Sequence, residues 1–523
     1  MTEETNTSTN PLFNLSHYAI GNSAQTTPDK QALEIIGPPL QGLEKATWTY
    51  RELDLTIRTG ANGLISKGIE PGTFLLLRLN SNAAFVFCFF SAIAAGLVPI
   101  PLSPSLQPPE LKFFLTDTGA SWMLKAENLS CPENQALNII TETEFINLIN
   151  THTPLKTYAP THREDPAYLI TTSGTTNKPK GVLHAQRTIC GRTPMRSGWH
   201  DITSTDRVLH AGDYNWTYTL GLGLMDAFVN GATALIVHEQ KSPQIWPKLI
   251  ATHKATIFAA VPGVYRQILK YAAPKKENFT SLRHCLSAGE TLPSSLKTEW
   301  ETTTGIPIYE ALGQSEISTY VSTAPGFDVP KDAKGRIQQG RTIAILPEKQ
   351  EGPNNTTPLP ANKKGLIAID IKDPGLMLGY WQEQKQQPLP RRGNWFLTGD
   401  IGSIDENNNL THHGRADDIM NAQGYRVSPQ EVESALMATG LLKEAAVFEK
   451  QIRPDLSLIS ALIIPKNPGE NETTLKNAIF AHLKTTLANY KHPKEIKVTK
   501  TLPHTTNGKL QRHHLATWVK SQK

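Results

Sequence analysis

The residues best suited to chemistry lie in one short polar stretch, YLITTSGTTNKPKG at positions 168–181. It begins with an apolar run, Tyr168 to Ile170, that is typical of a buried strand, and it continues in residues that disfavour helix and sheet. This continuation offers hydroxyl donors, a flexible glycine and positive charge, on Thr172, Ser173, Gly174, Thr175, Thr176, Lys178 and Lys180. Such groups can turn amides, hydroxyls and ammonium groups towards an anion. The pattern therefore predicts a cradle for a polyphosphate, with ATP as the expected ligand.

An ordinary polar surface loop is the alternative interpretation of the same stretch. A P-loop is excluded because the required Gly-Lys-Ser/Thr ending before a helix is missing. The stretch resembles, nearly letter for letter, the phosphate loop of the adenylate-forming superfamily, which comprises acyl-CoA synthetases, luciferases and the adenylation domains of peptide synthetases. Asn177 stands where that family usually has Gly. Because Asn is the next most tolerant residue for a left-handed backbone, we expect the loop to keep its shape.

Two motifs in the middle of the chain strengthen the resemblance. The segment SAGET at 287–291 resembles the one that lines the adenine in this family, which implies that the base contacts Gly289, Glu290 and Thr291. Taken alone, the segment would be read as a helix start. The segment EALGQSE at 310–316 resembles the family's Tyr-Gly-x-Thr-Glu motif, with Leu312 in place of the usual Tyr, and implies that Glu316 holds Mg2+. A hard cation takes oxygen ligands, although an isolated Glu would otherwise be a solvated charge.

Another motif concerns the sugar of the nucleotide. The segment WFLTGD at 395–400 resembles the one whose Asp grips the ribose hydroxyls, and Asp400 occupies that place. A carboxylate is a suitable acceptor for two vicinal hydroxyl donors. Arg415 is expected to support the same sugar or its phosphate. Pairing of Asp400 with Arg415 on the surface is the alternative.

The last motifs lie near the C-terminus, so the resemblance covers nearly the whole chain. Asp417 matches the hinge position at which the small domain swings between two half-reactions. In the family, the residue at Gly424 faces the thiol tunnel after the swing and that at Arg426 approaches the phosphates before it. The segment PHTTNGKLQR at 503–512 matches the closing Pro-x-Thr-x-x-Gly-Lys motif, which makes Lys509 the catalytic residue. Its ammonium would offset the repulsion between a carboxylate and the α-phosphate.

The acyl pocket is expected around two positions. Relatives that take acetate commonly carry Trp immediately before the Gln-Thr-Glu string, and Gly313 occupies that place here. The missing indole predicts an acid larger than acetate, so Gly313→Trp is expected to shift preference towards acetate or propionate. Trp216 resembles the aromatic segment that flanks the acyl site, with Tyr218 two residues further on. A buried core Trp is the alternative.

Together the motifs predict an AMP-forming acyl-CoA synthetase that uses ATP, Mg2+ and coenzyme A to activate a medium-chain, branched or aromatic acid. The first alternative is a stand-alone adenylation enzyme that loads a carrier protein. A non-catalytic nucleotide-binding homologue is a second, suggested by Asn177 and Leu312, and a luciferase-like oxygenase is a third. The chain contains no GxSxG elbow and no GxGxxG sequence after a strand, which argues against a serine hydrolase and a dinucleotide oxidoreductase.

The elements that must position these motifs alternate between strand and helix. A helical pattern from 48 to 66, a strand at 74–79, an apolar helix and a strand at 98–102 predict a parallel sheet. A second unit of the same kind is expected from the phosphate loop onward, with strands at 233–237 and 256–261. After a β-rich section that ends at 418, the pattern indicates a capped helix from Ser428, strands at 445–449 and 458–464, and a helix at 475–487. We therefore expect an α/β fold with a large N-terminal domain, 1–416, of mixed and mainly parallel sheets, and a small mobile α+β domain, 417–523.

Composition excludes several classes of protein. The chain has 523 residues, of which 39% are hydrophobic and 19% charged, which is typical of a soluble globular protein of two or more domains. Its net charge of +5 is spread without a basic block, so no nucleic-acid partner is expected. The four cysteines are far apart and the N-terminus has no export signal, which predicts a cytoplasmic protein. Residues 83–102 carry no charge but contain Gly and Pro in their last third, so a buried helix and strand are favoured over a membrane span. The adjacent histidines at 412–413 and 513–514 lack metal-ligand spacing and are expected at the surface.

Overall fold

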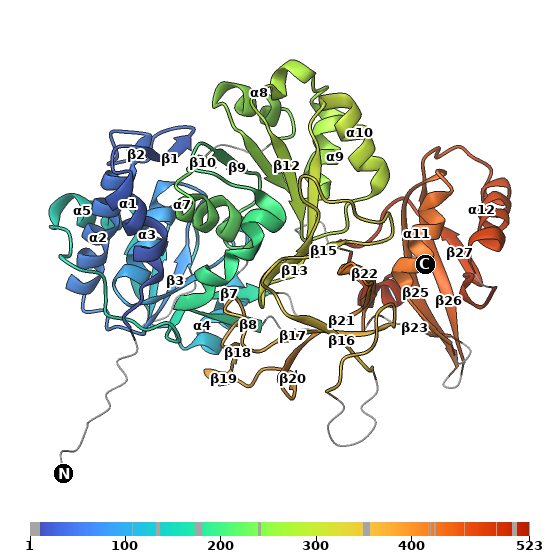
Figure 1. Ribbon diagram of the computed structural model, residues 1–523. Helices are drawn as coiled ribbons and strands as arrows, with labels where there is room; N and C mark the ends of the chain where they lie inside the picture. The colour runs from blue at the N-terminus through green and yellow to red at the C-terminus, as the bar shows by residue number, and fades with distance from the viewer. Residues whose placement is uncertain are drawn as a thin grey trace, which may run out of the picture. The chain divides into compact units, whose positions relative to one another are not determined.

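The computed structural model describes residues 11–106, 108–131, 136–172, 180–238, 242–348, 356–416, 418, 420–422, 425–453, 456–487, 489–504 and 510–521. The chain has an α/β fold with a large mixed sheet and a separate smaller C-terminal domain, as predicted (Figure 1). Its contacts divide it into two compact units, unit 1 with 1–329, 334–342 and 371–390, and unit 2 with 330–333, 343–370 and 391–523. This division differs from the predicted boundary between residues 416 and 417, and that boundary stays a prediction.

The first predicted helix is α2, Tyr50–Ser66, and its start has a local cause. The Thr49 hydroxyl accepts a hydrogen bond from the Glu52 amide at 3.3 Å, and the Glu52 carboxylate accepts one from the Thr49 amide at 2.8 Å. This capping box satisfies two amides that the first turn leaves without partners. Gly60 lets α2 lie close to α3 (Ala83–Ala94), because an added Cβ would lie 2.4 Å from the Ser91 hydroxyl.

The predicted strand, helix, strand sequence at 74–102 is confirmed. Strand β3 (Phe74–Arg78), helix α3 and strand β4 (Val98–Pro101) follow one another, and β3 pairs in parallel with β4 and with β5 (Trp122–Lys125). Strand β6 (Asn138–Thr141) continues this parallel sheet beside β5. All twelve residues of α3 are buried. In the part of the chain that the structure describes, we find no helix with the length and apolarity needed to cross a membrane.

A larger sheet forms the centre of unit 1. It runs parallel from β1 through β10, β9, β11 and β12 to β13, and then β14 and β15 pair antiparallel. Its strands are β1 (Gln31–Ile36), β9 (Arg207–His210), β10 (Thr233–Val237), β11 (Ile257–Ala260), β12 (His284–Ala288), β13 (Ile308–Gln314), β14 (Ser318–Ser322) and β15 (Gly335–Ile337), with β2 (Thr47–Thr49) beside β1. Because β12 and β13 are parallel neighbours, the loops that follow them lie at the same edge of the sheet. These two loops carry the predicted adenine residues and Glu316.

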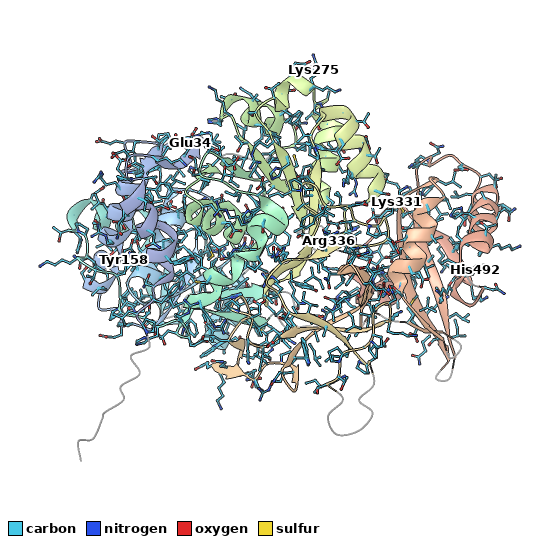
Figure 2. All side chains as sticks on the ribbon, viewed as in Figure 1. Glu34, Tyr158, Lys275, Lys331, Arg336 and His492 are labelled. Atoms are coloured by element: carbon cyan, nitrogen blue, oxygen red, sulfur yellow. The ribbon has the colours of Figure 1, made fainter. Side chains whose placement is uncertain are left out.

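Helices and ion pairs hold the central sheet. A second hydrophobic core forms around helices α8 (Ile245–Thr252), α9 (Pro262–Tyr271) and α10 (Ser294–Thr304). Glu34, labelled in Figure 2, lies on β1. Across the sheet its carboxylate pairs with Arg207 on β9, and its Oε1 lies 2.6 Å from His253 Nδ1. These partners tie together two strands that β10 separates. Unit 1 also contains the helices α1 (Asn22–Thr26), α4 (Pro108–Thr118), α5 (Glu142–Thr151), α6 (Thr217–Leu220) and α7 (Ala227–Val229).

The strand before the phosphate loop belongs to a different sheet from the one predicted. Strand β7 (Pro166–Thr172) pairs antiparallel with β8 (Lys180–Ala185), which pairs antiparallel with β18 (Gly379–Gln382). Strand β19 (Lys385–Gln387) closes this small sheet. The two strands named for the second parallel unit are confirmed as β10 and β11, which pair in parallel with β9. The first strand after the loop, β8, is antiparallel and belongs to the separate small sheet. Only seven residues separate β7 from β8, whereas a parallel crossover needs about a dozen or more.

Unit 2 combines an antiparallel sheet and a mixed three-stranded sheet with helices. Its first sheet has the order β16 (Ile343–Leu346), β17 (Gly365–Asp370), β21 (Trp395–Ile404) and β22 (Asn409–Arg415), and the two-residue β20 (Arg391–Arg392) pairs with β21. The predicted helix from Ser428 is α11 (Pro429–Ala438), whose Glu431 amide donates to the Ser428 hydroxyl. A three-stranded sheet of β25 (Leu442–Arg453), β26 (Leu456–Pro465) and β27 (Glu495–Val498) packs with α12 (Glu472–Thr486) around a core that includes Val432, Val447 and Ile479. The hairpin β23 (Met420–Ala422) and β24 (Tyr425–Val427) precedes it, and α13 (Leu515–Ser521) is the last element.

Candidate functional site

The ends of the predicted phosphate loop are held together as a hairpin. Thr172 is the last residue of β7 and Lys180 is the first of β8, and the Thr172 hydroxyl lies 3.4 Å from the Lys180 carbonyl oxygen. Behind them the His184 ring stacks on Tyr168, with ring centroids 4.6 Å apart, and burial lowers the pKa of His184 to about 3. The two strands at the base of the loop are therefore held to each other, and His184 on β8 is uncharged at neutral pH. Ser173, Gly174, Thr175 and Thr176 lie outside the described residues.

The predicted adenine segment meets the predicted acyl-site tryptophan. Gly289 follows β12 directly with a φ of 90°, which only glycine adopts readily. A Cβ at this position would lie 2.7 Å from the Trp216 indole, so the ring packs against the bare backbone. Glu290 and Thr291 continue the segment as a loop, because α10 begins only at Ser294. Unit 1 thus brings together the residues expected to contact the base and the acid.

An aromatic cluster surrounds Trp216. The Trp216 and Tyr218 rings meet edge to face with centroids 6.0 Å apart, and His210 lies 4.4 Å from Tyr218 on the other side. The Tyr218 hydroxyl donates to the Leu286 carbonyl at 3.0 Å, and burial raises the pKa of that hydroxyl. Trp216 is only half-buried, whereas Tyr218 is 9% exposed. The partly exposed Trp216 ring, backed by the buried rings of Tyr218 and His210, suits the contact of a flat or apolar acyl group.

Glu316 lies in the short connection between β13 and β14, held at two points. Its carboxylate oxygen Oε1 accepts a hydrogen bond from the Tyr380 hydroxyl at 2.7 Å, and its carbonyl oxygen accepts one from the Met377 amide at 2.8 Å. Among the described residues, no group of three or more His, Cys, Asp or Glu side chains could hold a metal ion. A cation at Glu316 would therefore rely on one carboxylate together with phosphate oxygens and water. That arrangement fits Mg2+ bound to a nucleotide.

The structure does not support open space at Gly313. This residue lies in β13, where a Cβ would be 2.3 Å from the Ser318 carbonyl oxygen and 2.6 Å from the Thr319 Cα. Both atoms belong to the backbone of the paired strand β14, next to an irregularity in the pairing at Leu312 and Gly313. The missing side chain thus lets two strands approach each other. We therefore no longer expect Gly313→Trp to shift substrate preference towards acetate. We expect this variant not to fold, because the indole would collide with the β14 backbone.

The smallest substitution tests this interpretation. We expect Gly313→Ala to lower the free energy of unfolding by about 1–3 kcal/mol, because the methyl group must push the two strands apart. The matched control is Gly263→Ala in α9, where a Cβ meets nothing within 4 Å and alanine favours the helix. Urea unfolding of both variants measures the difference. A Gly313→Ala protein as stable as the control would return this position to the acyl pocket.

The predicted ribose residues pair with each other in unit 2. Asp400 on β21 lies opposite Arg415 on β22, and Arg415 Nη1 is 3.4 Å from Asp400 Oδ1 and 2.9 Å from the Thr398 carbonyl oxygen. His412 Nε2 lies 3.5 Å from the same carboxylate oxygen. Asp400 is 7% exposed, whereas the Arg415 side chain is 33% exposed, so the carboxylate is buried and the guanidinium reaches the surface. The expected surface positions of His412 and His413 hold only in part, because both residues are half-buried, and burial lowers the pKa of His413 to about 4.

The remaining predicted residues lie near the C-terminus. Asp417, Gly424 and Lys509 fall outside the described residues, and Arg426 is placed only by its backbone in β24, opposite Asn421. Asp418, next to Asp417, and Arg512, three residues after Lys509, are described. Arg512 donates to both carboxylate oxygens of Glu433 and lies 3.6 Å from Asp418.

Tyr380 and one buried ion pair at the site were not found from the sequence. Tyr380 lies 64 positions after its hydrogen-bond partner Glu316. The ion pair joins Arg192 to Asp226, and Arg192 also donates to the Ser318 hydroxyl at 2.8 Å. Neither lies in a motif that we interpreted. A single charged residue inside an apolar segment, Asp226 in GLGLMDAFV at 221–229, was the one signal that could have pointed to the buried pair.

Comparison with known proteins covers both parts of the chain. Residues 21–381 match the family model described as AMP-binding enzyme, and residues 431–509 match the AMP-binding enzyme C-terminal domain. A 3-hydroxybenzoate–CoA/4-hydroxybenzoate–CoA ligase of Thauera aromatica is 28% identical over 92% of this chain and 96% of that protein. The mitochondrial acyl-coenzyme A synthetase ACSM5 of Rattus norvegicus is 29% identical over 90% of this chain and 84% of that protein. A crystal structure of an anthranilate CoA ligase in complex with anthranoyl-AMP superimposes with a TM-score of 0.84, at 25% identity, covering 98% of this chain and 99% of the other.

Proposed function

This chain belongs to the AMP-binding enzyme family, and from that membership we propose that it is an ATP-dependent acid–CoA ligase for carboxylic acids larger than acetate. In the first half-reaction, a carboxylate oxygen of the acid bonds to the α-phosphorus of ATP and pyrophosphate leaves. In the second, the thiol sulfur of coenzyme A bonds to the carbonyl carbon, AMP leaves with the electron pair of the broken bond, and the thiol proton passes to solvent.

The contact between Trp216 and Gly289 carries this proposal. Adenylate formation requires the acid and the nucleotide to meet at the α-phosphate, so their binding residues must be neighbours. The Trp216 ring and the backbone at Gly289 lie directly against each other in unit 1. The acid then lies along the aromatic cluster, and the base lies along the loop that follows β12.

The other predicted residues keep their proposed roles. The phosphates lie in the cradle of Thr172, Ser173, Gly174, Thr175, Thr176 and Lys180. Asp400 accepts from the ribose hydroxyls, with Arg415 beside it. Lys509 supplies positive charge at the α-phosphate, and rotation about Asp417 brings Gly424 to the thiol in place of Arg426. Glu316 holds Mg2+, which neutralises phosphate charge when it is bound.

Among larger acids, we favour an aromatic carboxylic acid of the benzoate type. The cluster of Trp216, Tyr218 and His210 offers ring faces and edges, which interact favourably with another ring. Two of the relatives reported above are named for hydroxybenzoate and anthranilate. The third is named only as an acyl-coenzyme A synthetase, a name that does not specify the acid, and an aliphatic acid is the second candidate. The four cysteines are free, which agrees with the proposed cytoplasmic location.

The proposal is tested by AMP formation from ATP and Mg2+ with a graded panel of acids. The panel contains acetate, straight-chain and branched acids, benzoate and hydroxybenzoates, each with and without coenzyme A. We expect AMP and the aromatic acyl-CoA to appear together, and acetate to give neither, because acetate is too small to contact the Trp216 ring. AMP formation without transfer to coenzyme A would contradict the ligase assignment and would direct the assay to a carrier protein. Activity with acetate alone would contradict the size of the pocket.

A further inference from the structure

Tyr380 connects two residues that the proposed function assigns to ATP. It lies on β18, between β8 and β19, and its backbone pairs with Val182. Its hydroxyl donates to Glu316 Oε1 at 2.7 Å. Its ring faces Lys180, whose Nζ lies 5.1 Å from the ring centroid. The hydroxyl and the ring of one side chain thus contact the proposed metal carboxylate and the proposed phosphate lysine.

The strand that carries Tyr380 is firmly anchored. The neighbouring Trp381 ring packs edge to face on Phe74 of β3, with centroids 4.8 Å apart. Three residues before Tyr380, the Met377 amide donates to the Glu316 carbonyl oxygen at 2.8 Å. The segment 377–381 therefore holds both the backbone and the carboxylate of Glu316. A group held in this way has its orientation set before any ligand arrives.

Resting on the proposed function, we propose that Tyr380 is a positioning residue for magnesium-bound ATP. A carboxylate has two oxygens, so Tyr380 can hold Oε1 while the other oxygen takes the cation. The ring keeps the Lys180 ammonium close to the same place through a cation–π contact. Tyr380 acts through Glu316 and Lys180 and needs no contact with the reacting atoms.

Two substitutions separate the hydroxyl from the ring. Tyr380→Phe removes the bond to Glu316 and keeps the ring over Lys180, whereas Tyr380→Leu removes both. The matched control is Tyr271→Phe, which deletes a hydroxyl from a residue that is 53% exposed at the end of α9. Thermal unfolding of all three variants checks that they fold.

The measurement is calorimetric binding of ATP without acid, once with Mg2+ and once with EDTA. We expect Tyr380→Phe to raise the Kd for ATP with Mg2+ by about 10-fold or more, as for the loss of other partners that orient metal ligands. Its Kd in EDTA should stay that of the wild type, since the ring still faces Lys180. Tyr380→Leu should weaken ATP binding in both conditions, and Tyr271→Phe in neither.

The outcomes distinguish this inference from the proposed function. A folded Tyr380→Phe protein with unchanged affinity for ATP in Mg2+ overturns the inference. Equal weakening in Mg2+ and EDTA overturns it too, because the hydroxyl would then act without the metal carboxylate. A wild-type protein that binds no ATP and forms no AMP with any acid overturns the proposed function instead.

Discussion

Lys509→Ala is expected to slow adenylate formation by roughly a hundredfold or more, by analogy with the loss of one preorganised donor from an oxyanion site. A negatively charged carboxylate must approach the α-phosphate of a polyanionic nucleotide, and charge builds up there as the new bond forms. An ammonium group at this point offsets both. The thioester step starts from the neutral carbonyl carbon of the adenylate, so it should be less affected.

Two assays separate the half-reactions. Exchange of labelled pyrophosphate into ATP reports adenylation, and transfer from supplied acyl-AMP to coenzyme A reports the second step. Lys500→Ala is the matched control, because it removes an exposed lysine from the same compact unit and should leave both rates unchanged. Equal losses in the two assays after Lys509→Ala would count against this role. Normal exchange in Lys509→Ala would exclude the residue from catalysis.

Local signals in the sequence predicted most of the elements correctly. The helix after Ser428 was predicted from its cap, and the helical pattern at 48–66 is confirmed as α2, which begins at Tyr50. The apolar run at 83–102 was resolved by its Gly and Pro residues into α3 and β4. The predicted adenylate-forming family and α/β class are likewise confirmed. These features depend on neighbours in the chain.

Features that depend on how strands pair in the folded chain were missed. The space next to Gly313 is filled by the backbone of β14. The irregular pairing of β13 and β14 decides that a side chain at this position would point into that backbone. Tyr380 reaches Glu316 because β18 joins the sheet of β7 and β8, which no pattern near Tyr380 indicates. His412 and His413 are polar residues that suggest a surface position, but both contact residues of the neighbouring strand β21: His412 lies beside Asp400 and His413 beside Ser403. In each case the sequence identifies the residue type, and tertiary pairing decides its surroundings.

Asp226→Ala is expected to lower the free energy of unfolding by about 3–5 kcal/mol, because it leaves a buried guanidinium without its counter-charge. Arg192 Nε and Nη2 each lie 2.6 Å from one oxygen of Asp226, and the two side chains are 5% and 4% exposed. The guanidinium packs on Gly221, where a Cβ would be 2.3 Å from Nη2, so the cation cannot turn towards that side. It therefore remains buried when the carboxylate is removed.

This pair also connects parts of the proposed site, which sharpens the test. Trp216 precedes α6, and the helical segment Gly221–Asp226 follows α6 directly, so Asp226 lies ten residues after Trp216 in one continuous helical stretch. Arg192 donates a hydrogen bond to the Ser318 hydroxyl, and Ser318 lies two residues after Glu316. Urea unfolding of Asp226→Ala is compared with Asp29→Ala, which breaks an exposed ion pair with Arg51 and should cost less than about 1 kcal/mol. The double variant Arg192→Met with Asp226→Leu removes both charges and should recover much of the lost stability. If the double variant is as unstable as Asp226→Ala, packing around the pair, and not the unpaired charge, accounts for the loss.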